Sequence, residues 1–199
     1  TFSMTRTTST DLPLGFMRAI DLNRDGKMDL VGINYTGGVV SVLRGKGDGT
    51  FTSQPLSDSY SISGPHGFVF GDFDDDNNKD IVLFADGPPS MFFFHSNGDG
   101  TLRKPAVGLS APTAIAAIQA ADMNRDGRDD LVVVDTPGFL RTYSYSGGSS
   151  MAQLGSSAVA GSGIWDLAVG DLDNDLVPDA AAVSLNTRET EDTHLRWLA

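Results

Sequence analysis

The chain has 199 residues, of which 40% are hydrophobic, and this is enough apolar material to bury a core and to exclude a largely disordered chain. Acidic residues number 26 against 14 basic ones, and the formal net charge of -12 gives no electrostatic support for a nucleic-acid or anionic-membrane partner. No cysteine is present, which excludes disulfides and thiolate metal sites. All but two of the acids, Glu189 and Glu191, are Asp, which indicates that the acid is placed in particular loops.

Four similar acidic segments follow one another along the chain. They begin at Asp21, Asp72, Asp122 and Asp171, so their starts are 51, 50 and 49 residues apart. A turn rich in Gly and Asp follows the first two, at 45–51 and 96–102, and a weaker version follows the third at 146–148. This spacing predicts a repeat protein with units at approximately 1–49, 50–100, 101–150 and 151–199.

Within each repeat, β-branched and aromatic residues predict short strands. In the second repeat, residues 67–70 precede the acidic segment, 80–84 follow it, 91–95 lead to the Gly-Asp-Gly turn, and Thr101 begins a fourth strand. Residues 114–121 are rich in Ala but occupy the place of 67–70, so we expect a strand there as well. Four antiparallel strands in about 50 residues is the size of a propeller blade, and the predicted fold is an all-β propeller of four four-stranded blades.

Both ends of the chain fall inside a repeat. Residues 1–2 match 50–51, and residues 195–199 reach the strand position of 40–44. The frame predicts either a piece of a longer array of blades or a ring closed by pairing the first and last strands.

Oxygen-bearing side chains recur at positions 1, 3, 5 and 9 of each acidic loop. Calcium takes six to eight oxygen ligands at about 2.3–2.6 Å, and a tight loop can supply them from alternate side chains and from the carbonyl at position 7. The predicted side-chain ligands are Asp21, Asn23, Asp25 and Asp29; Asp72, Asp74, Asp76 and Asp80; Asp122, Asn124, Asp126 and Asp130; and Asp171, Asp173, Asp175 and Asp179. The predicted carbonyl donors are Lys27, Asn78, Arg128 and Val177. The fourth loop departs most from the pattern, because Leu176 replaces Gly and Pro178 enters it, so we expect that site to bind weakly or not at all.

Two other kinds of loop share this composition. An EF-hand needs a bidentate Glu at position 12, where this chain has Gly32, Leu83, Val133 and Ala182. Ordinary polar turns are also rich in Asp and Asn, but four copies that keep positions 1, 3, 5 and 9 favour a cation loop.

The acidic loop, paired with Gly-Asp-Gly-Thr-Phe at 47–51, resembles the FG-GAP/VCBS repeats, the blades of integrin α-subunit-type propellers. The resemblance covers essentially the whole chain. It implies a β-propeller with up to four Ca²⁺ ions, each in the hairpin loop between the first two strands of a blade. Because the rings of this family usually have seven blades, the resemblance favours a fragment of a larger propeller, or a partner that supplies the missing blades, over a closed ring of four blades.

No catalytic constellation is apparent, so we expect no enzyme activity. The three histidines, His66, His95 and His194, occupy different repeat positions, and no nucleophile elbow, zinc-protease or Walker motif is present. Aromatic residues could stack on a sugar, although most are expected to fill the space between blades; these are Trp165, Trp197, Tyr35, Tyr60, Tyr143 and Tyr145. Asn34 begins an N-glycosylation sequon.

The sequence therefore predicts a secreted or cell-surface, calcium-binding interaction module with a protein or glycan ligand. Alternatives are a carbohydrate-binding lectin, a subunit of a surface filament or sheath, and an accessory propeller of a secreted enzyme. Residues 1–11 lack the regions of a signal peptide, so any signal is expected to have been removed, and no apolar run is long enough to insert into a membrane. Homo-oligomerisation or further blades from a longer chain could extend the array.

Overall fold

The structure, a computed structural model, describes residues 14–34, 39–55, 62–86, 91–103, 107–109, 114–147, 150–158, 164–185 and 193–198. Fifteen strands run through these residues: β1 (Leu14–Ile20), β2 (Asp29–Asn34), β3 (Val40–Gly45), β4 (Phe51–Pro55), β5 (Pro65–Gly71), β6 (Asp80–Ala85), β7 (Met91–Phe94), β8 (Val107–Leu109), β9 (Ile115–Ala121), β10 (Asp130–Asp135), β11 (Phe139–Tyr145), β12 (Met151–Ala158), β13 (Ile164–Gly170), β14 (Asp179–Leu185) and β15 (Thr193–Leu198). None of the described segments forms a helix that is long and apolar enough to cross a membrane.

The strands form four antiparallel sheets in chain order. Three sheets have four strands each, β1 to β4, β5 to β8 and β9 to β12, and the fourth has β13, β14 and β15. The predicted all-β fold is thus confirmed, and the Ala-rich segment is strand β9. Each sheet begins with the strand before an acidic loop, and in the first two sheets the last strand follows the Gly-Asp-Gly turn, as in the pairing of Gly45 with Phe51. The sheets are therefore offset from the repeat units counted in the sequence, because that turn lies inside a sheet.

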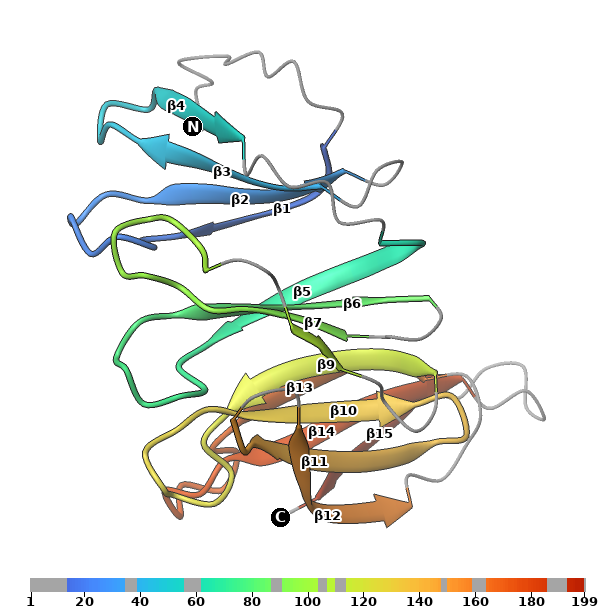
Figure 1. Cartoon of the computed structure of the whole chain (residues 1–199). Coiled ribbons are helices and arrows are strands. Elements are labelled where there is room, and N and C mark those ends of the chain that lie inside the picture. The colour runs from blue at the N-terminus through green and yellow to red at the C-terminus, as the bar shows by residue number, and fades with distance from the viewer. Residues whose placement is uncertain are drawn as a thin grey trace, which may run out of the picture.

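The sheets are blades packed face to face, and Figure 1 shows the first, second and third from top to bottom, with the fourth behind the third. The acidic loops, β1–β2, β5–β6, β9–β10 and β13–β14, lie along one edge of the stack (Figure 1). No described strand of the first sheet pairs with a strand of the fourth, so the four blades make an open arc of a propeller.

Side chains alternate along the second strand of each interior blade, so its two faces belong to two different cores. Ile81 and Leu83 of β6 pack against the first blade around Val31, whereas Val82 packs against the third blade around Leu131. In the same way Val132 of β10 faces the fourth blade. Successive residues of a strand point to opposite faces, so a strand between two blades must be apolar throughout.

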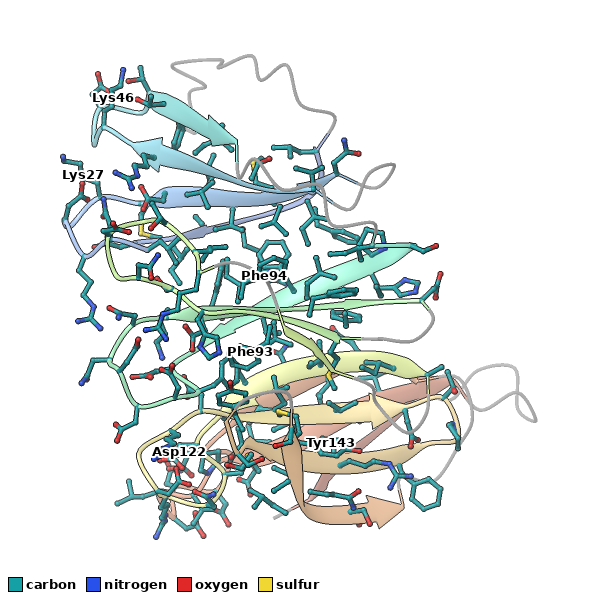
Figure 2. All side chains as sticks on the ribbon, viewed as in Figure 1. Lys27, Lys46, Phe93, Phe94, Asp122 and Tyr143 are labelled. Atoms are coloured by element: carbon teal, nitrogen blue, oxygen red, sulfur yellow. The ribbon has the colours of Figure 1, made fainter. Side chains whose placement is uncertain are left out.

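The third strand of the second blade follows the same rule. Phe94 belongs to the core between the first two blades, and Phe93 belongs to the core between the second and third. Figure 2 shows the two rings pointing to opposite sides of the sheet. Phe93 also stacks on Tyr145 of the third blade, with ring centroids 4.5 Å apart.

A cavity of about 440 Å³ lies where the first strands of the four sheets converge. Its walls come from β1, β5, β9 and β13, with Phe84 of β6. The polar side chains at its lining are Arg18, His66, Gln119 and Asp166.

Candidate metal centres

Each acidic loop joins the first two strands of a blade, as the sequence predicted. The residue at position 9 is the first residue of the second strand and is buried; Asp29, Asp80 and Asp130 are 0% exposed and Asp179 is 3% exposed. A buried carboxylate is costly unless hydrogen bonds or a cation compensate its charge. The position-9 acids therefore mark the floor of each loop.

The loop backbone adopts the left-handed conformation at positions 4 and 6 in all four copies. Position 6 holds Gly26, Asn77, Gly127 and Leu176, and position 4 holds Arg24, Asp75, Arg125 and Asn174, with φ between 57° and 90°. Gly and Asn suit this region, but Leu does not. The sequence pointed to Gly at position 6, and the requirement at position 4 was missed because that residue varies in type.

Backbone amides hold the acids of the first loop in place. Asp21 accepts from the N–H groups of Asp25 and Gly26 at 3.1 and 2.9 Å. Asp29 accepts from the N–H of Leu22 at 3.2 Å through Oδ2. The third and fourth loops repeat this set, with Asp122 and Asp130, and Asp171 and Asp179, as the acceptors.

Positions 3, 5 and 7 are linked in every loop. The side chain at position 3 accepts from the N–H at position 5, over 2.8–3.3 Å, and the Oδ1 at position 5 accepts from the N–H at position 7. The position-7 residues Lys27, Asn78, Arg128 and Val177 thus close each turn through their amides, over 2.7–2.9 Å. Coordination by their carbonyls stays a prediction.

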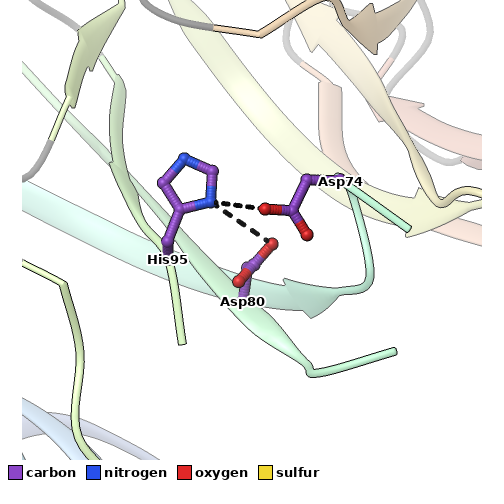
Figure 3. A group of neighbouring side chains, drawn as sticks. All are labelled: Asp74, Asp80 and His95. Carbon is purple, nitrogen blue, oxygen red and sulfur yellow. Dashed lines mark ion pairs between the residues drawn. The ribbon is translucent and has the colours of Figure 1, made fainter. Parts of the chain in front are cut away.

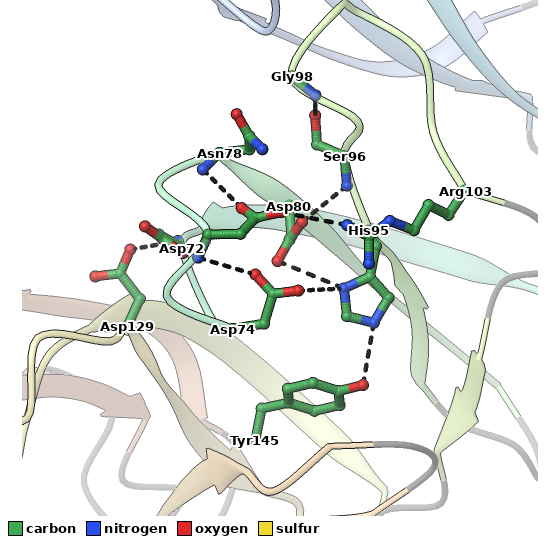
Figure 4. A network of polar contacts seen from close by, with 11 residues as sticks. Asp72, Asp74, Asn78, Asp80, His95, Ser96, Gly98, Arg103, Asp129 and Tyr145 are labelled. Atoms are coloured by element: carbon green, nitrogen blue, oxygen red, sulfur yellow. Dashed lines mark hydrogen bonds and ion pairs between the residues drawn. The ribbon is translucent and has the colours of Figure 1, made fainter.

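Some buried carboxylate oxygens of the loops receive no such donor. Asp72 Oδ1 and Asp80 Oδ2 of the second loop, and Asp130 Oδ1 of the third, are buried without a hydrogen-bond partner. The carboxylates of Asp72, Asp74 and Asp76 offer oxygens that lie within 4.8 Å of one another. Figure 4 shows Asp72, Asp74 and Asp80 around the second loop.

The fourth loop also gathers three predicted ligands, Asp171, Asp173 and Asp179, within 4.8 Å of one another. This loop departs most from the sequence pattern, yet its backbone follows the other three. The exposed Leu176 takes the place of Gly at a φ of 70° and leaves the acids in position.

Burial raises the pKa of several loop acids. The pKa of Asp80 rises to about 7 and that of Asp130 to about 6, in both cases mainly because burial disfavours the charged form. Burial also raises the pKa of Asp72, whereas the N–H of Lys27 lowers the pKa of the exposed Asp25. Positive charge from the protein thus does not fully compensate the carboxylates of Asp72, Asp80 and Asp130, and a bound cation would do so.

Few basic side chains enter the loops. Lys27 Nζ lies 3.4 Å from Asp25, and Arg103 lies 3.5 Å from Asp76. Figure 2 places Lys27, Lys46 and Asp122 along the edge that carries the loops.

The Gly-Asp-Gly turns are built by their acids. Asp48 Oδ1 accepts from the N–H and hydroxyl of Thr50, and Asp99 Oδ1 accepts from the same groups of Thr101. Asp48 and Asp99 therefore act as turn residues, as the sequence indicated.

Of the remaining candidate residues, some are buried between blades and others lie outside the described part of the chain. Tyr143 and Tyr145 are buried between blades, 6% and 8% exposed, and are not available to stack on a sugar. Trp165 and Trp197 lie in strands β13 and β15, and their side chains are outside the described part of the chain, as are Tyr35 and Tyr60 entirely. Asn34 ends β2, half-buried, and the rest of its sequon lies outside the described residues.

One residue beside the second loop was not predicted to be a ligand. His95 follows β7, and its Nδ1 lies 3.1 Å from Asp74 Oδ2 and 3.9 Å from Asp80 Oδ2 (Figure 3). The pairing of Ile81 with Phe94 brings it beside Asp80. The expected hairpin of 80–84 with 91–95 could have pointed to this contact.

Comparison with known proteins follows the same division into repeats. The model of the FG-GAP-like repeat matches residues 21–83, 72–133 and 123–182. Solved structures with a similar fold include the biofilm matrix protein Bap1 of V. cholerae, with 20% identity and a TM-score of 0.46 over 94% of this chain and 37% of that one. Another is the Aleuria aurantia lectin, described as a six-bladed β-propeller with a novel mode of fucose recognition, with 12% identity and a TM-score of 0.49 over 92% of this chain and 59% of that one.

The chain spans less than two thirds of the length of either structure. No curated protein matches its sequence.

Proposed function

This chain belongs to the FG-GAP-like repeat family, and we propose that it is a calcium-stabilised β-propeller module that acts outside the cytosol by binding another protein or by assembly at a cell surface. The observation that carries the proposal is the repetition of one acidic loop, with a buried Asp at its floor, at the same edge of all four blades. Calcium is the hard cation that such an oxygen-rich loop suits.

The charge of the chain supports the same proposal. Fourteen of the 26 acidic residues occupy predicted ligand positions. Four bound Ca²⁺ ions would change the formal charge from -12 to -4. A site occupied at 100 times its dissociation constant adds about 2.7 kcal/mol to the free energy of unfolding, so calcium would act as part of the fold. Extracellular calcium is high enough to load sites of modest affinity.

A binding role, not a catalytic one, fits the chemistry of the loops. Backbone N–H groups of the turn donate hydrogen bonds to the loop side chains and fix their positions, which suits a structural ion. We propose a protein partner or further blades, from a longer chain or a second copy, as what extends the open arc. Light scattering of the purified chain would distinguish a lone four-bladed unit from an assembly.

Thermal unfolding with calcium and with chelator tests the proposal directly. We expect calcium to raise the unfolding midpoint by several degrees, and the gain to shrink in Asp25→Ala. The matched control is Asp86→Ala, which removes the same charge from a side chain that is 68% exposed and outside every acidic loop. Equal midpoints in calcium and chelator would overturn the proposal.

A second candidate function, recognition of a glycan or another small polar ligand, is favoured by the cavity at the convergence of the first strands. Its volume of about 440 Å³ is in the range of ligand pockets, and Phe84 and His66 offer ring faces beside Arg18 and Asp166. A glycan array would test this candidate, with His66→Ala as the variant that should lose binding. Signal that His66→Ala leaves unchanged would place any binding elsewhere.

A further inference from the structure

We propose that Asp74, Asp80 and His95 form a site for one divalent transition-metal ion, of which Zn²⁺ is the probe. The proposal shares two acids with the second loop and so rests on the proposed metal-binding role of that loop, but it assigns this blade a different ion. One nitrogen and two oxygen donor atoms of these residues lie within 4.8 Å of one another (Figure 3).

The donor atoms converge without satisfying one another. Asp80 is completely buried, and neither its Oδ2 nor His95 Nδ1 has a hydrogen-bond partner. Two ligands of a tetrahedral ion at about 2.1 Å lie about 3.4 Å apart. The distances from His95 Nδ1 to Asp74 Oδ2, 3.1 Å, and to Asp80 Oδ2, 3.9 Å, lie on either side of that separation. An ion between these atoms would compensate the buried carboxylate.

Neighbouring groups hold the donors in position, as Figure 4 shows. His95 Nε2 lies 3.0 Å from the hydroxyl of Tyr145, so a proton on Nε2 can be donated to that oxygen and leaves the lone pair of Nδ1 directed at the acids. The N–H of Ser96 donates to Asp80 Oδ1 at 2.8 Å and leaves Oδ2 free for the ion. A hydrogen bond from the other ring nitrogen orients a histidine that binds a metal ion.

An imidazole ligand distinguishes this blade from the others. His95 follows Phe94, which pairs with Ile81 of the second strand. The residue at the equivalent place is Arg44 in the first blade and Ser144 in the third. Calcium selects oxygen ligands, whereas imidazole nitrogen suits zinc and other transition metals. Asp72 and Asp76 offer further oxygens around the shared Asp74.

The competing arrangement is an ion pair of protonated His95 with the two acids, which needs no metal. The charged groups that face this cluster are Asp72, Asp76 and Arg103, the last 3.5 Å from Asp76. Only a metal arrangement makes Zn²⁺ affinity depend on the imidazole.

The experiment is calorimetric titration of the 199-residue chain with ZnCl₂ and, separately, with CaCl₂. We expect one Zn²⁺ site, whose affinity falls at least about 10-fold in His95→Gln. Loss of a group that only orients a metal ligand already lowers metal affinity by about that factor. Tyr145→Phe, which keeps the ring that stacks on Phe93, should weaken Zn²⁺ less. His66→Gln is the matched control, because His66 also lies beside an acid, Asp86 at 2.6 Å, but is exposed.

A measurement on the unmutated chain guards against a variant that fails to fold. Zinc should shift the imidazole ¹⁵N resonances of His95 and leave those of His66 in place. Absence of a Zn²⁺ site, or Zn²⁺ affinity that His95→Gln leaves unchanged, would overturn the inference. Calcium binding at the other loops with no His95-dependent zinc site would contradict this inference alone, and zinc binding at His95 with no calcium site would contradict the proposed function alone.

Discussion

Asp72 and Asp129, from the acidic loops of neighbouring blades, bind each other through two reciprocal contacts. The N–H of Asp72 donates to Asp129 Oδ2, and the N–H of Asp129 donates to the carbonyl of Asp72, both at 2.8 Å. Lys79 Nζ also lies 2.7 Å from Asp129 Oδ2. The two loops are therefore joined directly and not only through the apolar core between their blades.

Removing this joint should loosen both loops. We expect Asp129→Ala to lower the free energy of unfolding by about 1–3 kcal/mol, because it removes the acceptor of a backbone N–H and of Lys79. Urea unfolding would measure the loss. Asp86→Ala, on an exposed side chain, should cost much less, and an equal cost in both variants would contradict a special role for the joint.

The two adjacent rings of β7 should report on different interfaces. Phe93→Ala and Phe94→Ala each remove a fully buried ring, and each should cost about 3–5 kcal/mol. Hydrogen exchange should then accelerate at β10 in Phe93→Ala and at β2 in Phe94→Ala, because each ring packs on one neighbour only. The same exchange pattern in both variants would show that the cores are not separate.

The chelated protein should lose stability as the pH rises from about 4 to about 7. Burial raises the pKa of Asp80 to about 7 in the folded state and that of Asp130 to about 6, against an ordinary value of 3.8. In that window the folded state binds more protons than the unfolded state, so the free energy of unfolding falls as the pH rises and levels off above it.

Thermal midpoints in chelator across this range would measure the fall, and Asp80→Asn should flatten it because the amide carries no charge. A midpoint that rises steadily from pH 5 to pH 7.5 in chelator would contradict the prediction.

Leu176→Gly should stabilise the fourth loop. The residue has a φ of 70°, and its side chain is 81% exposed, so little packing is lost when it is removed. Relief of the left-handed strain, about 1–2 kcal/mol, opposes the extra freedom of Gly in the unfolded chain, about 0.5–1 kcal/mol. We expect a net gain of up to about 1 kcal/mol in urea unfolding.

The reverse change at the first loop is the natural control. Gly26→Ala should destabilise, and only through its backbone, because an added Cβ there would meet no atom within 4 Å. A loss of stability in Leu176→Gly would show that the Leu side chain makes contacts that outweigh the strain.

The repeated strands and acidic loops could be predicted because each position has the same structural role in every repeat. Asp29 and its three equivalents recur at one spacing, and strand β9 was identified by its place in the repeat in spite of its Ala content. Contacts made by one blade alone could not be found in this way. His95 has no histidine at the equivalent place in the other blades, and Asp129 occupies a loop position whose residue type varies.

The offset between sheets and sequence repeats has a similar origin. The Gly-Asp-Gly turn is the sharpest landmark after the acidic loop, and it suggests a boundary. Its hydrogen bonds, such as that from Thr50 to Asp48, instead hold the third and fourth strands of one sheet together. The pairing of the strands places the fourth strand, which follows the turn, in the same sheet as the third, in agreement with the strand order expected for the second repeat.

The two-sided burial of β6 has a consequence for how such a chain can change over time. Substitutions at Ile81 and Leu83 are constrained by the residues of the preceding blade, and those at Val82 by the residues of the following one. Odd and even positions of one strand should therefore covary with different partners among related sequences. A duplicated or exchanged blade would fold stably only if both of its faces pack well against its new neighbours. The residues on the two sides of an interface between blades should therefore evolve together more closely than the residues within one blade.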